Sequence, residues 1–295
     1  MKIDPNKIPT AKFHGFMLGA VAPRPIAFAS TVDEEGNVNL SPFSFFNAFG
    51  ANPPTMIFSP ARRVRDNTTK HTLENVKKVP EVVINIVSFD IVEQMSLSST
   101  EYPDGVNEFL KSGLTESPSE KIKPPRVKES RASFECKVTK VIETGSEGGA
   151  GNLIICEVLL AHIKDDILDE NGKIDPFKLD AVGRMGGNWY VRASGNALFE
   201  VNKPLKTMGI GVDKIPENIR NSEILSGNDL GKLGNVEKLP EQEVVNEFAN
   251  EPEISAILEY FTDNPEERVT ELHKLAKEFL GDGEIEKAWK TLLQS

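Results

Sequence analysis

The sequence predicts an antiparallel β-barrel domain followed by a smaller helical region. Short apolar, strand-like runs follow one another through residues 23–165, with turn signals and few helices between them. This order is typical of a barrel rather than of a doubly wound parallel sheet. No Gly-x-Gly-x-x-Gly pattern follows a strand, so a Rossmann nucleotide site is not expected. The texture changes near residue 203, and we therefore expect two domains, residues 1–202 and 203–295.

The first half of the barrel domain combines short strands with two helices. Strands are expected at residues 23–32, 38–46, 54–59 and 81–87, and helices at residues 69–79 and 90–100. The acidic, Gly-containing turn Asp33–Asn37 should join the first two strands as a hairpin. Asn52–Pro54 separates the next pair, and Thr68 or Thr69 is the expected N-cap of the first helix.

The rest of the chain falls into three parts. Residues 101–130 contain four prolines and are expected to be irregular. Two long strands, residues 132–143 and 152–165, follow and are joined by a glycine-rich loop. Residues 203–238, rich in Gly, Pro and Asn, should wrap over the surface, and amphipathic helices are expected at residues 240–250, 252–261, 265–280 and 284–293.

The charge balance argues against two classes of partner. The net charge of −11 disfavours nucleic acid and anionic membrane surfaces. The charge is uneven, because residues 1–200 carry 23 Lys and Arg against 26 Asp and Glu, whereas residues 201–295 carry 11 against 19. The first part is therefore nearly neutral, and a local cluster of cations within it is compatible with binding an anionic phosphate.

Other features fit a cytoplasmic protein without a metal. Apolar runs such as Val82–Val87 are far too short to cross a bilayer, and the N-terminus has no apolar signal-peptide core. Cys136 and Cys156 lie in separate strand-like segments without metal-ligand spacing, which indicates free, buried thiols. The histidines do not converge with acidic residues or cysteines in a ligand pattern, and His162, within an apolar strand, is expected to be structural.

The most informative chemistry lies between residues 22 and 75. Strand-like runs there end in hydroxyls, an amide and cations, with aromatic residues between them. Such a mixture suits a flat aromatic ligand with a phosphate tail, since aromatic and backbone groups hold a ring while hydroxyls and Arg or Lys hold an anion.

This stretch resembles the flavin reductase-like family, whose fold is the FMN-binding split barrel and which includes flavoredoxin. The resemblance is close over residues 15–100 and continues with gaps to about residue 200. It rests on a Pro-Arg-Pro-Ile pattern at residues 23–26, on Ser41–Asn47 and on Lys70-His71-Thr72 with Asn75. It implies an FMN site formed by Arg24, Ser30, Thr31, Ser41, Ser44, Phe45, Phe46, Asn47, Ser59, Arg62, Arg63, Lys70, Thr72 and Asn75.

Each of these residues also has a plain structural interpretation. Arg24, fixed between two prolines, is either a directed cation or a surface arginine at a strand start. Ser30 and Thr31 are either flavin contacts or turn formers. The Ser41–Asn47 segment alone also describes a barrel strand with core phenylalanines. The family commonly has Asp where this chain has His71, which leaves the phosphate role of its neighbours plausible and makes His71 a surface or cap residue.

A later segment, Ala181–Ala193, resembles a family region with Gly-Arg and a Gly-Gly-x-x-Tyr ending. Paired glycines there permit the close approach of a ligand or of another backbone. The side chains lie either on the substrate or nicotinamide side of the pocket or in a dimer interface: Arg184, Trp189, Tyr190 and Arg192.

The leading hypothesis is an FMN-dependent oxidoreductase that transfers hydride from NADH or NADPH to flavin or another acceptor. No Ser-His-Asp order, nucleophile elbow or pair of catalytic carboxylates is visible, which agrees with chemistry carried by a cofactor. The alternatives are an FMN electron carrier like flavoredoxin and a non-catalytic binding module that keeps the fold. The resemblance also implies a homodimer with FMN near its interface.

Overall fold

A computed structural model describes all residues, 1–295, and divides the chain into two compact units, Met1–Phe199 and Glu200–Ser295. The division lies a few residues before the boundary expected at 202. Each unit has its own hydrophobic core.

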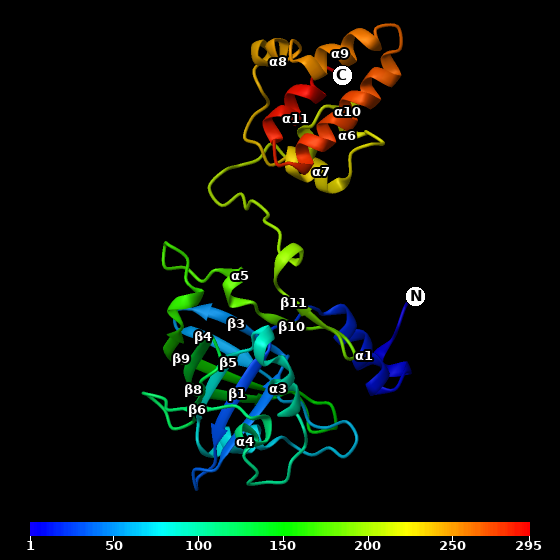
Figure 1. Cartoon of the computed structure of the whole chain (residues 1–295). Coiled ribbons are helices and arrows are strands. Elements are labelled where there is room, and N and C mark those ends of the chain that lie inside the picture. Colours follow the sequence, from blue (N-terminus) through cyan, green and yellow to red (C-terminus); the bar gives the residue numbers. More distant parts are fainter. The chain divides into compact units, whose positions relative to one another are not determined.

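A seven-stranded sheet in the order β2-β1-β5-β8-β9-β4-β3 forms the first unit (Figure 1). All neighbouring strands are antiparallel. The strands are β1 (Ala27–Val32), β2 (Val38–Phe43), β3 (Phe46–Ala51), β4 (Pro54–Phe58), β5 (Glu81–Ile86), β8 (Ala132–Glu143) and β9 (Asn152–Ile163). The predicted split-barrel fold is confirmed, and so is the hairpin at Asp33–Asn37, where the Asp33 N–H donates to the Asn37 carbonyl.

The expected strand over residues 38–46 is interrupted, and the interruption closes the barrel. Only Ser44 and Phe45 separate β2 from β3, although these two strands lie at opposite ends of the strand order. The sheet must therefore curl until its edges approach at Ser44 and Phe45. The first strand is also shorter than expected, because Pro23 and Pro25 cannot donate to a ladder and β1 begins only at Ala27.

A helix fills one side of this curled sheet. The α2 helix (His71–Lys78) buries Leu73 and Val76 against Ala29, Phe58 and other residues of the barrel core. Their spacing of three residues places both on one face of the helix. The expected cap is wrong, because Lys70 occupies the N-cap position without a side-chain bond and the Thr68 hydroxyl donates to Asp66 instead.

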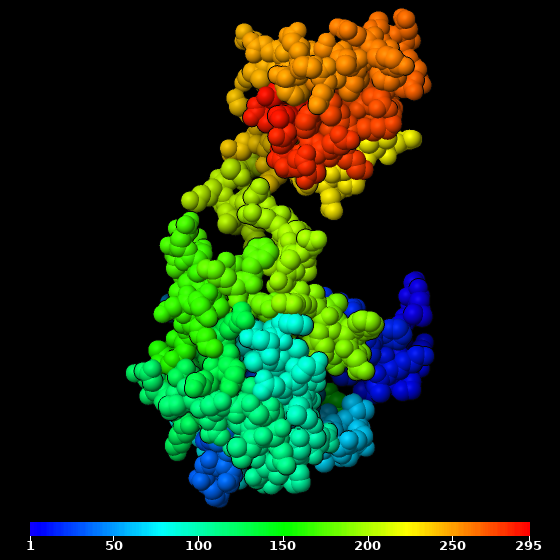
Figure 2. Space-filling view, in the orientation of Figure 1, coloured from blue at the N-terminus to red at the C-terminus, as the bar shows by residue number.

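The other face of the sheet is covered by the segment that was expected to be irregular. That segment, residues 101–130, contains α4 (Glu108–Ser112), β6 (Glu116–Ser117) and β7 (Arg126–Val127). It packs beside α3 (Val92–Leu97), which lies within the helix expected at residues 90–100. In Figure 2 the cyan-to-green atoms form much of one face of this unit. The buried Glu108 carboxylate accepts the Leu40 N–H of the edge strand β2 at 2.9 Å, and burial raises the pKa of Glu108.

The N-terminal helix was not anticipated. The α1 helix (Thr10–Ala20) contains no buried residue, and its exposed face includes Phe16 and Met17. The unit is completed by α5 (Pro176–Leu179), β10 (Val182–Arg184) and β11 (Tyr190–Arg192). Backbone bonds in both directions between Arg24 and Arg184, at 3.0 and 2.8 Å, attach β10 next to the start of β1.

The loop after β4 rests on the turn between β8 and β9. The Arg62 N–H donates to the Ala150 carbonyl at 2.8 Å, and the Gly149 N–H donates to the Arg62 carbonyl. A Cβ atom at Gly148 would lie 3.0 Å from the Val64 carbonyl oxygen. Glycine is therefore needed for the two loops to approach so closely.

The second unit is helical. Its helices are α6 (Glu217–Arg220), α7 (Gly227–Leu233), α8 (Gln242–Phe248), α9 (Pro252–Tyr260), α10 (Pro265–Gly281) and α11 (Ile285–Leu292). Figure 1 shows α10 and α11 side by side, and Leu280 and Trp289 from these helices are buried together. The expectation that residues 203–238 only wrap over the surface is wrong, because Ile219 and Leu233 belong to this core.

The predictions for the two cysteines and for His162 are confirmed. Cys136 and Cys156 are free and buried, and burial raises the pKa of the Cys136 thiol to about 12. His162 is structural, since its Nε2 atom lies 2.6 Å from the Glu135 carboxylate. No group of His, Cys, Asp and Glu side chains is arranged to hold a metal ion. None of the helices combines the length and apolar composition needed to span a membrane.

Candidate functional site

A cavity of about 490 Å³ lies where the two edges of the sheet approach. It is bordered by α1, the end of β2, the segment after β4 and the end of β10. Its size falls in the range of small-molecule and cofactor sites. It is lined by His14, Leu18, Arg24, Pro42, Phe43, Ser44, Phe45, Ser59, Ala61, Lys70, Arg184, Met185 and Gly187.

The charges of this cavity are one-sided. Three cations, Arg24, Lys70 and Arg184, and the imidazole of His14 line it, and no Asp or Glu does. Burial lowers the pKa of Arg24, and the positive charge of Arg184 lowers it further. Burial and then the charge of Arg63 lower the pKa of Lys70. An anion bound here would relieve this repulsion and favour the charged form of each group.

Arg24 shapes the cavity wall with its guanidinium. Nη1 donates to the carbonyl of Leu18 at 2.6 Å and to that of Val21, and Nη2 donates to the Met185 carbonyl at 2.8 Å. Nε lies 3.4 Å from the Ser44 hydroxyl oxygen. One side chain thus joins the end of α1, the end of β2 and the segment after β10. Its donors are mostly taken by the protein itself, so it positions the site more than it offers bonds to a ligand.

Lys70 stands between the cavity and a second group of charges. Arg63 Nε donates to Glu101 at 3.0 Å, Arg65 also contacts Glu101, and Lys70 Nζ lies 4.0 Å from the same carboxylate. Arg63 further donates to the Thr69 carbonyl. Glu101 therefore neutralises this group partly, whereas Lys70 keeps access to the cavity.

Aromatic side chains supply the apolar part of the site. Phe45 lines the cavity and meets the His14 ring edge-on, with centroids 5.9 Å apart. Phe43 lines it from the core side and packs on Phe58 at 5.5 Å. The Ser59 hydroxyl oxygen accepts the Asn152 N–H at 3.0 Å, which fixes the end of β4 at the cavity.

Three predicted contacts lie elsewhere, in a buried hydrogen-bond network under α2. Asn39 Nδ2 donates to the Thr72 hydroxyl at 2.9 Å, and Asn75 Nδ2 donates to the Thr31 hydroxyl at 3.1 Å. Asn39 also lies 3.5 Å from the Thr31 hydroxyl. None of these residues lines the cavity. The network joins β1, β2 and α2 and has a structural role.

Other predicted contacts are also outside the cavity. The Ser30 hydroxyl is buried without a partner, and Phe46 packs on the barrel core. Asn47 is exposed and accepts the N–H of its neighbour Ala48. Ser41, in β2, does not line the cavity, and neither does Arg62, whose guanidinium donates to Asn67 at 2.7 and 2.9 Å.

The segment at Ala181–Ala193 divides in the same way. Arg184 lines the cavity and stacks on the Tyr190 ring, 4.5 Å from its centroid. Arg192 instead binds Asp180 through two nitrogens at 2.7 and 2.8 Å and stacks on Phe89. Trp189 is 77% exposed. Arg184 is the cation of this segment that faces the site.

Sequence reasoning missed the contribution of α1. His14 and Leu18, four residues apart and so on one face of this helix, both line the cavity. The run of apolar residues from Phe13 to Leu18 around His14 was the available signal. Met185 and Gly187 were also missed, although they lie in the segment whose glycines were noted.

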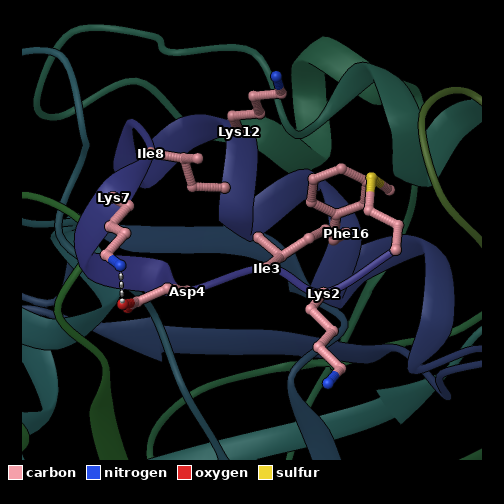
Figure 3. Close-up of a pocket in the computed structure, with 8 residues that line it drawn as sticks. Lys2, Ile3, Asp4, Lys7, Ile8, Lys12 and Phe16 are labelled. Atoms are coloured by element: carbon pink, nitrogen blue, oxygen red, sulfur yellow. Dashed lines mark ion pairs between the residues drawn. The ribbon is translucent and has the colours of Figure 1, made fainter.

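A separate cavity at the N-terminus has a different character (Figure 3). Its volume is about 530 Å³, and its lining comes only from residues 1–16. Ile3 and Phe16 lie near each other, while Lys2 and Lys12 extend away and Lys7 pairs with Asp4 at 3.8 Å. It brings together no residues from distant parts of the chain and none of the predicted site residues.

Comparisons with known proteins show what the barrel unit is similar to. A flavin reductase like domain matches residues 18–178, more than half of the chain. An uncharacterized protein of Aquifex aeolicus is 42% identical over 185 residues, which cover 63% of this chain and 92% of that protein. The helical unit lies outside the matched domain.

Solved structures extend the likeness to the fold. Nitrilotriacetate monooxygenase component B from Bacillus cereus is 29% identical with a TM-score of 0.64, covering 68% of this chain and 98% of that one. A split-barrel protein of Shewanella frigidimarina is 27% identical with a TM-score of 0.58, covering 69% of this chain and 99% of that one.

Proposed function

The chain belongs to the flavin reductase-like family, and we propose that it binds FMN in the 490 Å³ cavity and transfers hydride from NADH or NADPH to an acceptor. The observation that carries this proposal is a cavity with three cations and two phenylalanines and without a carboxylate. These residues fit the cofactor, because a phosphate needs cations and a flat ring needs aromatic and apolar walls.

Each side of the cavity has its own task. Lys70 holds the phosphate, and Phe45 with His14 borders the ring. Arg24 keeps α1 and the segment after β10 in place around the ligand. Bound FMN would supply the ring that accepts and gives hydride. Arg184 faces the same space and orients an anionic reactant.

Binding can be tested with two ligands that differ only in the phosphate. We expect FMN to quench or shift protein fluorescence on titration, and Lys70→Met to weaken FMN about tenfold, as the loss of a bond to a charged group does. Riboflavin should bind wild type and Lys70→Met equally. Lys78→Met, on the same helix and 58% exposed, is the matched control. Wild-type protein that binds neither ligand would refute the proposal.

The hydride step needs a separate measurement. Stopped-flow mixing of the FMN-loaded protein with NADH or NADPH should bleach the flavin much faster than it bleaches free FMN. A rate no faster than that of free FMN would instead support an electron carrier.

We also propose a homodimer that covers apolar surface near the cavity. Phe45 is 37% and Phe49 64% exposed, and Phe49 lies on the edge strand β3. Such side chains at a sheet edge favour association. Light scattering coupled to size-exclusion chromatography should give a molar mass of two chains per particle. Phe49→Lys should shift the molar mass toward that of one chain. Leu110→Lys, on α4 and 80% exposed, should not change it.

A further inference from the structure

A second, smaller cavity adjoins the proposed flavin cavity. Its volume is about 160 Å³, and Pro42, Ser44 and Arg184 line both. A ligand in the smaller cavity would therefore lie next to a ligand in the larger one. We call it the serine chamber, because Ser96 in α3 and Ser99, two residues after this helix, line it in addition to Ser44.

The serine chamber has an excess of hydrogen-bond donors. The hydroxyl of Ser96 and that of Tyr190 make no hydrogen bond, and the Ser44 oxygen only accepts from Arg24. The hydroxyl of Ser99 is already used, since it donates to the Ser96 carbonyl. Three hydroxyl hydrogens are thus free to bind an acceptor atom.

Arg184 gives the serine chamber its charge. Its guanidinium makes one long hydrogen bond, at 3.4 Å to the Trp189 carbonyl, and no acidic residue lines either cavity beside it. Tyr190 holds the guanidinium by stacking rather than by neutralising it. No acidic side chain lines the chamber. A cation with free N–H groups beside free hydroxyls is the arrangement that recognises a carboxylate or another oxyanion.

The other walls limit the size of the ligand. Ile26, Pro42 and Met95 are apolar, and Ile26 and Met95 are buried. A dry cavity of about 150 Å³ is known to hold benzene. A chamber of about 160 Å³ therefore takes a flat body of that size.

We propose that the serine chamber binds a small organic carboxylate, about the size of benzoate, as the second substrate beside the flavin. The carboxylate contacts Arg184, Ser96 and Tyr190, and the apolar body lies against Ile26 and Met95. This inference rests on the proposed function, because the chamber gains its role only when flavin occupies the larger cavity.

The test uses the full-length protein loaded with FMN and two probes that differ in charge, benzoate and benzamide. Calorimetric titration should show benzoate binding at least about tenfold more tightly than benzamide, since a bond to a charged group is the stronger one. Ser96→Ala and Tyr190→Phe should each weaken benzoate about three- to tenfold. Neither residue lines the larger cavity, so FMN affinity should stay within about twofold of wild type.

Thr100→Val is the matched control. It removes an exposed hydroxyl just after Ser99 that lines neither cavity, so it should leave benzoate binding unchanged. If FMN binds but benzoate does not, or if benzamide binds equally well, the serine chamber is refuted while the flavin site stands. Equal benzoate affinity in wild type and both variants would also refute it. A protein that fails to bind FMN would overturn the proposed function, and the chamber's role with it.

Discussion

Two polar clusters of the barrel unit differ in how completely their groups are satisfied. In the network under α2, the Thr31 and Thr72 hydroxyls accept bonds from Asn39 and Asn75, and neither threonine lines the 490 Å³ cavity. At the cavity, Arg184 has one long bond, and no carboxylate faces it. The hydroxyls of the first cluster are hydrogen-bonded within the cluster, whereas Arg184 in the second has donors and a positive charge that a ligand can bind.

This difference separates structural from ligand-binding polar residues better than residue type does. Hydroxyl side chains occur in both clusters, Thr31 and Thr72 in the first and Ser44 and Ser59 in the second. The buried hydroxyls under α2 are paired within the protein, as buried polar groups normally are, whereas the half-buried Arg184 keeps donors that a ligand in the cavity can accept. Arg24 shares a property with each cluster. It lines the cavity, but it donates to three carbonyls of the protein.

The largest effect is expected for Arg24→Met. The variant keeps the buried volume but leaves the carbonyls of Leu18 and Met185 without their donor. We expect the free energy of unfolding of the barrel unit to fall by about 3 kcal/mol, since each unpaired buried group costs about 1–3 kcal/mol. FMN affinity should fall at least about tenfold, because the cavity wall loosens.

Chemical denaturation and FMN titration measure these two changes. Arg126→Met is the control, since its guanidinium also donates to a carbonyl, that of Pro118, but at an exposed place. It should leave both quantities unchanged. Unaltered FMN affinity in Arg24→Met would show that the cavity does not depend on this arginine.

A smaller effect, on stability alone, is expected for Thr72→Val. The shape is kept, but Asn39 loses its 2.9 Å acceptor in a buried place. The free energy of unfolding should fall by about 2 kcal/mol, and FMN affinity should stay unchanged. Thr139→Val, which removes an exposed hydroxyl on β8, is the control. A tenfold loss of FMN affinity in Thr72→Val would place the network in the site and end the distinction between the clusters.

The sequence was sufficient for the barrel but not for the division of its polar residues. Strands such as β5 and β8 were predictable because apolar, β-branched runs end at turn residues. Lys70 and Thr72 are two residues apart, yet one lines the cavity and the other is buried in the network. On a helix, residues two apart face different directions, and only the packing of α2 decides which direction meets the cavity.

The long-range parts of the site were beyond local patterns. Arg24 and Arg184 are paired through their backbones across the whole barrel domain, and no local periodicity encodes that contact. The α1 helix was missed because its apolar residues are not gathered on one face, which is the pattern by which helices are recognised. Residues 203–238 were misjudged because their core residues are separated by glycines and turns.

His273 tests whether an unpaired group alone makes a site. It is buried in α10, its Nδ1 lies 2.7 Å from the Ser222 hydroxyl oxygen, and its Nε2 has no partner. His273 lines neither the flavin cavity nor the serine chamber. Burial lowers the pKa of His273 below its ordinary value. The unfolded chain therefore binds a proton at a higher pH than the folded unit does, and stability falls as the pH drops below about 6.5.

We expect the helical unit to lose up to about 1.4 kcal/mol per pH unit below that point, the limit for one proton. Thermal unfolding between pH 7.5 and 5.5 measures the loss, and His273→Gln should reduce it. FMN binding at neutral pH should be the same in both proteins. Equal pH dependence in wild type and variant would assign the loss to other groups.

The smallest effect is expected for Glu101→Gln, which changes the carboxylate next to Lys70. Glu101 lies 4.0 Å from Lys70 and competes with an anion for it. Glu101→Gln removes the negative charge, so FMN affinity should rise about two- to fivefold at low salt, as exposed ion pairs are weak. Riboflavin affinity should not change, since it has no phosphate. Because salt screens exposed charges, the gain should shrink at 0.5 M salt.

Glu93→Gln, exposed on α3, controls for net charge. A weaker affinity for FMN in Glu101→Gln would mean that Glu101 organises Arg63 and Lys70 for the phosphate instead of opposing it.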